Sequence, residues 1–126
     1  MYHVDIKNTG EYAFEVKAGE YHFTVDVSGA GVTPPDALLA SLGTCTGVYV
    51  RKYAQGVNLA LPEFNISVDA DFAKEPPLCF RKINVLIDFK GVKLEEKRLK
   101  AMLQFIKNCP VHNTLKNNPD VEVKVK

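Results

Sequence analysis

The sequence predicts an α+β fold in which antiparallel strands surround a buried central helix. Three observations predict it. Residues near the N-terminus alternate between apolar and polar, an apolar helical pattern follows, and a second pair of alternating stretches then precedes an amphipathic helix. We expect residues 1–126 to form a single domain, because 126 residues that are 46% hydrophobic suffice for one core.

Strand patterns occupy both halves of the chain. In the first half the apolar positions are Tyr2, Val4 and Ile6, then Tyr12, Phe14 and Val16, then Tyr21, Phe23, Val25 and Val27. A period of two predicts antiparallel strands with one covered face and one polar face. Residues 64–72 and 83–89 show the same alternation, and residues 121–125 predict a last short strand.

The first predicted helix spans residues 36–55. It follows a pair of prolines, ends near Gly56, and carries apolar residues on several faces, which predicts a buried central helix. Gly43 and Gly47 each cost about 1 kcal/mol of helix propensity against alanine. They indicate that a ligand, a second backbone or a packed neighbour of the same subunit comes close at these positions.

The second predicted helix spans residues 94–108 and ends at an unusual cysteine. Its apolar stripe consists of Leu99, Met102, Leu103 and Ile106. Three residues further on the stripe reaches Cys109, so the thiol is predicted to point toward the core. Pro110 cannot continue the helix but can start a short new one over residues 110–116. The positive end of that helix would favour a Cys109 thiolate.

Composition and charge exclude several classes of function. The 16 basic and 15 acidic residues are scattered along the chain, which predicts no nucleic-acid partner. The apolar-rich residues 38–53 are too few and too polar to cross a bilayer, so no membrane association is expected. The first residues do not read as a signal peptide, which predicts a cytoplasmic location. The three cysteines are then reduced by default, and a disulfide between them would be transient and catalytic.

Two motifs carry a specific resemblance. "TPPDALLASLGTC", followed later by "CPVHNTL", resembles the OsmC/Ohr family of osmotically inducible and organic hydroperoxide resistance proteins. The resemblance implies an OsmC-like fold, an intertwined homodimer with the cysteine pair near the subunit interface, and thiol-dependent reduction of organic hydroperoxides. In that mechanism Cys45 attacks the peroxide and Cys109 resolves the product. An external dithiol supplies the electrons, and no cofactor or metal is needed.

The chain departs from the family pattern at the residues that activate the first cysteine. Hydroperoxide reductases of the family use an arginine from the N-terminal hairpin and a glutamate just after the helix-starting proline. Here no arginine precedes Arg51, and Pro35 stands at the glutamate position, with Asp36 one place later. Asp36 is therefore a candidate auxiliary residue. Without the arginine, burial of Cys45 is expected to raise its pKa.

Two further residues have competing interpretations. His112 replaces the serine usual at its position and lies three residues after Cys109, on the same helix face. It either stabilises the Cys109 thiolate or is a surface histidine bonded to a backbone carbonyl. Cys79 matches no family motif and is interpreted as a structural residue at a strand end.

Two other functions remain open. The same fold could hold a small apolar ligand between subunits without catalysis, with the cysteines merely lining the pocket. A zinc site built from Cys45, Cys109 and His112 is the other alternative, although no C-x-x-C spacing supports it.

The first prediction concerns assembly. An apolar helix with small residues, and a sheet too large for one short chain to cover, predict an obligate homodimer. Sedimentation at micromolar concentration should give about twice the 14.0 kDa chain mass. A stable folded monomer would contradict the intertwined fold.

Overall fold

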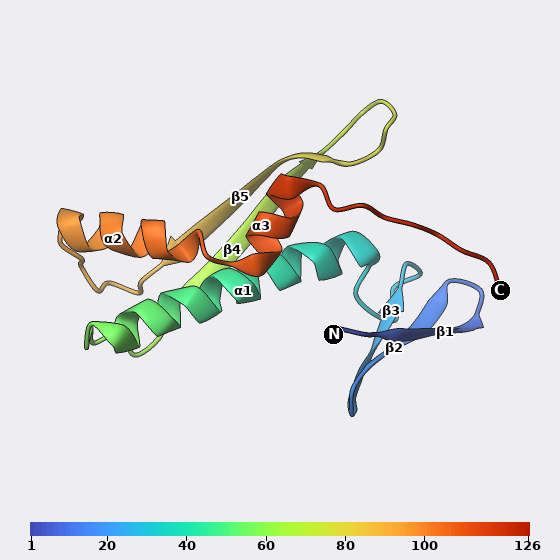
Figure 1. The fold of residues 1–126 in the computed structure, drawn as a ribbon, viewed down its shortest axis with the longest axis horizontal. Coiled ribbons are helices and arrows are strands. Elements are labelled where there is room, and N and C mark those ends of the chain that lie inside the picture. The colour runs from blue at the N-terminus through green and yellow to red at the C-terminus, as the bar shows by residue number, and fades with distance from the viewer. The chain divides into compact units, whose positions relative to one another are not determined.

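The computed structural model describes residues 1–126 as two compact units, Met1–Ala40 and Ser41–Lys126. Figure 1 shows the elements in chain order, which are β1 (Asp5–Gly10), β2 (Ala13–Ala18), β3 (Tyr21–Asp26), α1 (Pro34–Gly56), β4 (Asn65–Phe72), β5 (Phe80–Asp88), α2 (Glu96–Ile106) and α3 (Pro110–Asn117). The predicted α+β class, with antiparallel sheets, is confirmed. None of the helices combines the length and apolar character that a membrane span requires. The single-domain assignment of residues 1–126 stays a prediction.

The first unit contains an antiparallel sheet with strand order β1-β2-β3. Its first strand lies three residues later than the alternation suggested, because the chain reverses at Gly10 and Glu11. Both residues have positive φ, 121° and 48°. The Asn8 side chain supports this turn by donating to the carbonyl oxygen of Ala13 at 2.9 Å. The turn therefore fixes the register of the hairpin.

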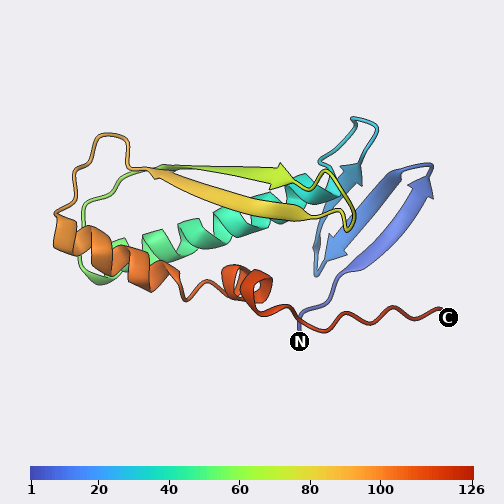
Figure 2. The same ribbon diagram turned by 90° about the horizontal axis from the view of Figure 1, so that it is seen from above.

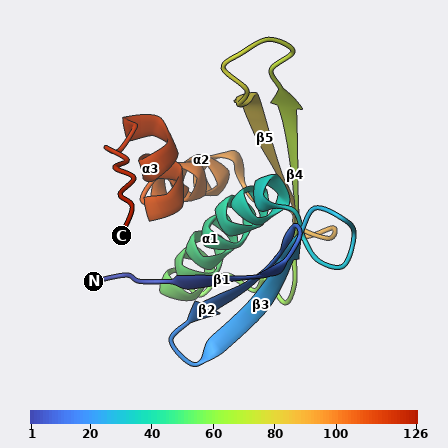
Figure 3. The same cartoon turned by 90° about the vertical axis from the view of Figure 1, so that its right-hand side faces the viewer.

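The second unit packs helices against an antiparallel hairpin formed by β4 and β5. Figures 2 and 3 show the helices on one side of this hairpin. The alternation along both strands explains the arrangement, since every second residue is half-buried. The buried cluster between hairpin and helices consists of Val50, Ala54, Leu61, Met102 and Ile106. This cluster anchors the C-terminal half of α1. The candidate site lies on the part of α1 that precedes the cluster.

Helix α1 confirms the predicted element and explains its glycines. A β-carbon added at Gly43 would lie 2.9 Å from Cγ2 of Val68, and one at Gly47 would lie 3.2 Å from Cδ1 of Ile66. Close packing against β4 inside the subunit therefore accounts for both positions. The expected burial of α1 on several faces is not confirmed within the single chain, because Val48 is 50% exposed.

Helix α2 differs from the prediction in which residues it buries. Met102 is fully buried, but Leu103 is 48% exposed. Phe105 packs in its place, with its ring centroid 5.8 Å from that of Tyr49 and 5.9 Å from that of Tyr53. The buried face is thus rotated toward α1, where the aromatic residues supply more contact area than a leucine. Cys109 is fully buried, so the predicted direction of its thiol is confirmed.

The predicted C-terminal strand is wrong for this chain. Residues 118–126 form no regular structure, and Val121, Val123 and Val125 are 84%, 86% and 96% exposed. A strand needs a neighbour that accepts and donates its backbone hydrogen bonds. No strand of the described chain pairs with this segment, so alternating valines alone do not order it.

The contact at Gly43 generates a stability prediction. In Gly43→Ala the new methyl group collides with Val68, a β-branched side chain held in β4. Overpacking costs about 1–3 kcal/mol and the gain in helix propensity returns about 1 kcal/mol, so we expect a net loss near 1 kcal/mol. Urea denaturation at a fixed protein concentration measures the free energy of unfolding.

The matched control for this prediction is Gly56→Ala at the other end of α1. Nothing lies within 4 Å of a β-carbon added there. The control should therefore keep or slightly raise the free energy of unfolding. A Gly43→Ala protein as stable as the control would show that β4 yields to the added methyl group.

Candidate active site

Two thiols from distant parts of the sequence meet in the second unit. Cys45 lies on α1 and is half-buried, while Cys109 immediately precedes α3 and is fully buried. Both are free thiols, and they are near enough for the Cys109 side chain to raise the pKa of Cys45. The structure thus brings together the two cysteines that the sequence selected as the catalytic pair.

The break between α2 and α3 positions Cys109. The Cys109 N–H still donates to the carbonyl oxygen of Ile106 at 3.0 Å, which completes the end of α2. Pro110 then occupies the first position of α3, where a missing N–H costs nothing. Cys109 therefore becomes the N-cap of α3, and its sulfur accepts a hydrogen bond from the backbone N–H of His112 at 3.4 Å.

The start of α3 provides donors to both sulfurs. The first N–H groups of a helix have no partner inside the helix. Here the N–H of His112 donates to the Cys109 sulfur at 3.4 Å, and the N–H of Val111 lowers the pKa of the Cys45 thiol. The positive end of the helix dipole lies at the same place. This helix start can therefore stabilise negative charge on the thiol pair.

The pKa of Cys45 is nevertheless raised. The largest cause is desolvation by burial, followed by the hydrogen bond to the Cys109 side chain, which favours the neutral thiol. Charge repulsion from Cys109 raises the pKa further. The Val111 N–H and the positive charge of Lys52 lower it but do not compensate. The structure thus agrees with the expectation that Cys45 lacks strong activation.

The two auxiliary residues have other observed contacts. Asp36 accepts a hydrogen bond from the Thr33 hydroxyl at 2.7 Å, and its N–H donates to the same hydroxyl oxygen at 3.3 Å. This reciprocal pair caps the start of α1. His112 reaches Cys109 through its backbone, and its half-buried side chain lines a groove against β5. Roles for the Asp36 carboxylate and the His112 imidazole in activating a thiol stay predictions.

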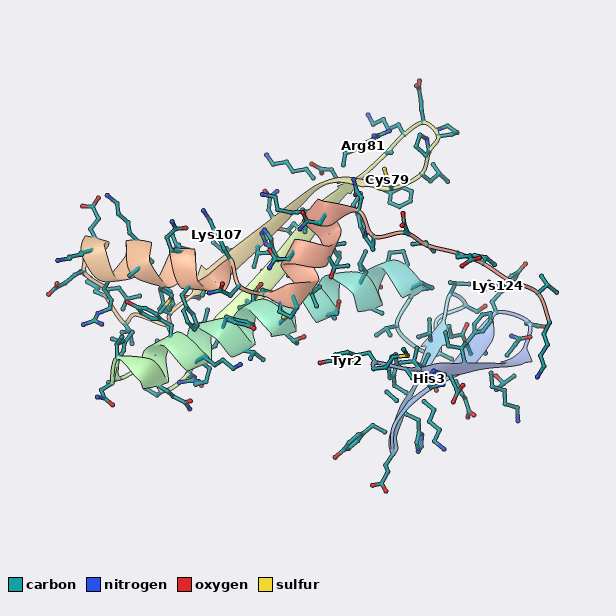
Figure 4. The ribbon with its side chains drawn as sticks, in the orientation of Figure 1. Tyr2, His3, Cys79, Arg81, Lys107 and Lys124 are labelled. Carbon is teal, nitrogen blue, oxygen red and sulfur yellow. The ribbon has the colours of Figure 1, made fainter.

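The third cysteine lies outside the pair. Cys79 precedes β5, and its carbonyl oxygen accepts a hydrogen bond from the Ala73 N–H at 2.8 Å, which closes the end of the hairpin. Figure 4 shows it beside Arg81, at the loop end of β5. No group of three or more His, Cys, Asp or Glu side chains is placed to hold a metal ion, so the zinc alternative has no ligand set.

Sequence reasoning missed the residues that set the charge around the pair. The Val111 N–H is a backbone group, so its side chain gives no signal. Lys52 lies seven residues after Cys45, two helical turns along α1, and this spacing could have indicated it. Arg51, the first arginine of the chain, is used elsewhere: its guanidinium donates to the Leu61 carbonyl and lies 5.1 Å from the Phe64 ring centroid.

Fold and site together define a class of protein. The class is that of small α+β chains in which one free thiol lies on a long helix and another caps a short helix. The chain belongs to the OsmC-like protein family, whose sequence model matches residues 9–124. This confirms the resemblance of the two motifs.

Solved structures share this fold. An OsmC-like protein from Mycoplasma pneumoniae superposes with a TM-score of 0.80 at 20% identity, covering 94% of this chain and 89% of the other. A hypothetical protein from Aquifex aeolicus gives 0.79 at 22% identity, covering 95% and 90%. An organic hydroperoxide resistance protein OsmC from Legionella pneumophila gives 0.66 at 18% identity, covering 97% and 95%. No match was found among curated proteins.

The causes of the Cys45 pKa shift predict opposite effects for two substitutions. Cys109→Ala removes a hydrogen bond and a repulsion that both raise the Cys45 pKa, so the pKa should fall. Lys52→Gln removes a positive charge that lowers it, so the pKa should rise further. Because the thiolate is the nucleophile, alkylation of Cys45 near neutral pH should become severalfold faster in the first protein and slower in the second.

Alkylation with iodoacetamide across pH, followed by peptide mass spectrometry, measures both shifts. Cys79→Ser as a common background removes the competing thiol, and Lys97→Gln on α2 controls for the loss of one exposed lysine. Shifts of the same sign in both variants would contradict the origin assigned to the pKa.

Proposed function

We propose that this protein reduces organic hydroperoxides to alcohols through a two-cysteine mechanism. The observation that carries the proposal is the interaction between the Cys45 and Cys109 side chains at the start of α3. Two reduced thiols in contact can pass through a sulfenic acid to a disulfide without a large movement of the chain.

The difference in exposure supports the proposed roles of the two thiols. Cys45 is half-buried and Cys109 is fully buried, so a peroxide reaches Cys45 first. The Cys45 thiolate attacks the terminal oxygen of R–O–O–H; a sulfur–oxygen bond forms and the oxygen–oxygen bond breaks. The alkoxide takes up the proton that Cys45 released and leaves as the alcohol. Cys45 remains as a sulfenic acid.

Cys109 then resolves the sulfenic acid. Its sulfur attacks the Cys45 sulfur, a disulfide forms, and the sulfur–oxygen bond breaks. The hydroxide takes up the proton of Cys109 and leaves as water, so two thiols have supplied the two electrons. An external dithiol returns the disulfide to two thiols by exchange. No cofactor or metal enters the proposed cycle.

Activation of Cys45 relies on this chain's own groups in the proposed mechanism. The Val111 N–H and the Lys52 charge favour the thiolate and take the place of the hairpin arginine that the chain lacks. Because burial and Cys109 keep the Cys45 pKa raised, the thiolate fraction is small at neutral pH and grows as the pH increases. Peroxide consumption should therefore increase with pH through the neutral and mildly alkaline range.

We also infer that the working protein is a homodimer. Many large apolar side chains are exposed in the single chain, including Tyr2, Ile6, Tyr21, Phe23, Val121, Val123 and Val125. Exposed apolar surface of this extent indicates an interface. A second chain would also offer a partner for the unpaired segment at residues 118–126. A cytoplasmic location, where external dithiols keep thiols reduced, fits the proposed cycle.

A second function is favoured by the raised pKa of Cys45. A thiol that stays protonated is a poor nucleophile, and the chain lacks the family's activating arginine. The protein would then bind a small apolar ligand without chemistry, with the cysteines lining the site. Failure to form a Cys45–Cys109 disulfide under organic peroxide would favour this function over the peroxidase.

Replacement of each cysteine tests the peroxidase directly. Cys45→Ser removes the nucleophile, so consumption of cumene hydroperoxide should vanish. Cys109→Ser should consume one equivalent and leave Cys45 as a sulfenic acid that dimedone traps. Cys79→Ser is the matched control and should keep turnover with dihydrolipoamide as reductant. Mass spectrometry after a short peroxide pulse identifies the labelled residue.

Two outcomes would change the proposal. Dimedone on Cys109 in the Cys45→Ser protein would reverse the roles of the two thiols. Reaction of neither cysteine faster than free cysteine would contradict the enzyme and leave the binding function.

A further inference from the structure

Tyr49 and Lys52 lie on the same face of α1 as the Cys45 thiol. They follow Cys45 by one and two turns of the helix, which places the three side chains in one row along the helix axis. Side chains of an α-helix lean toward its N-terminus, so those of Tyr49 and Lys52 lean toward Cys45. A ring and an ammonium group therefore follow the half-buried thiol on one helix face.

The Lys52 ammonium lies over the face of the Tyr49 ring. Its nitrogen is 5.0 Å from the ring centroid, which is within the range of a cation–π interaction. No carboxylate competes with the ring, because the ion pairs of the chain all join other residues. Val48 and Gly56, one turn before and after Lys52, are also not acidic. The positive charge of Lys52 is therefore not neutralised by an ion pair.

Phe105 of α2 holds the Tyr49 ring from the other side of the helix interface. The two ring centroids are 5.8 Å apart with the planes tilted by 49°, a favourable arrangement for an aromatic pair. Both residues are half-buried, whereas Lys52 is exposed. An exposed lysine side chain otherwise samples many rotamers. The ring is thus the fixed partner of this contact, and the lysine is the mobile one.

The position of the ammonium matters for Cys45. Burial is the largest cause of the raised Cys45 pKa, and Cys109, between α2 and α3, raises it further. The Val111 N–H of α3 and the charge of Lys52 on α1 act in the opposite direction. Because an electrostatic interaction weakens with distance, the ammonium favours the thiolate only while it stays near Cys45.

We propose that Tyr49 is a positioning residue, whose ring, packed against Phe105, keeps the Lys52 ammonium on the face of α1 that carries Cys45. The ring face makes the contact, so the tyrosine hydroxyl is not required and phenylalanine should replace it. That the positioned charge serves peroxide reduction rests on the function proposed above. The positioning of the charge beside the thiol does not.

The position of Lys52 can be measured without thiol chemistry. Protons held over an aromatic ring are shifted upfield by its ring current in NMR spectra. We expect the ε-methylene protons of Lys52 to resonate upfield of those of the other lysines in the reduced protein, with Lys52→Gln identifying the signal. The shift should persist in Tyr49→Phe and disappear in Tyr49→Leu. A Lys52 signal at the position of the other exposed lysines in the parent protein would overturn the proposal.

Alkylation of Cys45 across pH measures the effect on the thiol. Iodoacetamide is uncharged, so Lys52 changes the rate through the thiolate fraction. In the Cys79→Ser background, Tyr49→Leu should move the midpoint of the pH–rate profile upward and slow alkylation near neutral pH roughly twofold, since an exposed cation–π contact is weak. The limiting rate at high pH should not change. A lower limiting rate with an unmoved midpoint would assign the ring to access alone and overturn the proposal.

A double-mutant cycle shows whether Tyr49 acts through Lys52. In the Lys52→Gln protein, Tyr49→Leu should leave the midpoint unchanged, because the charge that the ring positions is gone. Tyr53→Leu is the matched control, since Tyr53 packs on the same Phe105 ring at 5.9 Å, whereas the lysine contacts Tyr49. This control should keep the parent profile. An equal upward shift by Tyr49→Leu with and without Lys52→Gln would overturn the proposal.

These measurements use no peroxide, so they separate this proposal from the peroxidase. If the midpoint depends on Tyr49 as expected but cumene hydroperoxide is not consumed, the peroxidase fails and the positioning role stands. If the peroxide is consumed and the midpoint does not respond to Tyr49→Leu, the positioning role fails and the peroxidase stands.

Discussion

The interactions of backbone N–H groups in the first turn of α3 with two thiols are the interactions on which the site depends. They exist because α2 ends at Ile106 and a separate helix, α3, starts at Pro110. The break leaves the N–H groups of Val111 and His112 without helical partners. The Cys109 sulfur accepts from His112, and the Val111 N–H lowers the pKa of Cys45. A continuous helix through residue 110 would use these donors internally and leave the thiols without them.

The same short helix also connects the thiols to the groove. Its first turn contacts the cysteines, while Leu115 and Lys116, one turn further on, line the groove against β5. The core cluster around Val50 and Met102 anchors α1 and α2 behind it. Because these elements pack against one hairpin, a shift in the position of α3 would alter the sulfur contacts and the groove together. The groove and the thiol pair therefore share a structural support.

Much of the fold could be predicted from the sequence, for identifiable reasons. Proline pairs and periodicity placed α1 and α3 to within a few residues, and the alternation in residues 64–72 and 83–89 gave the β4–β5 hairpin. The cysteine pair was predicted from its two motifs, and in the structure the two free thiols interact. Leu103 was assigned to the wrong face because a helical stripe fixes a face only to within about one residue, and Phe105 makes the larger contact. The alternating valines at 121, 123 and 125 led to a wrong strand prediction, because alternation specifies the two faces of a strand and not the strand with which it pairs. The bulge that leaves Arg81 without a partner in the β4–β5 ladder depends on cross-strand register, which one strand's sequence does not contain.

The backbone origin of the two donors has a consequence for how this site tolerates change. A replacement at position 111 or 112 by any residue except proline leaves the N–H in place, so alanine at either position would keep the backbone contact with the sulfur. His112 illustrates this freedom, since its contact with Cys109 is made by the main chain. The side chain at position 112 can therefore vary with the groove that it lines. The side chains at these two positions can therefore change while the backbone N–H groups near the sulfurs stay the same.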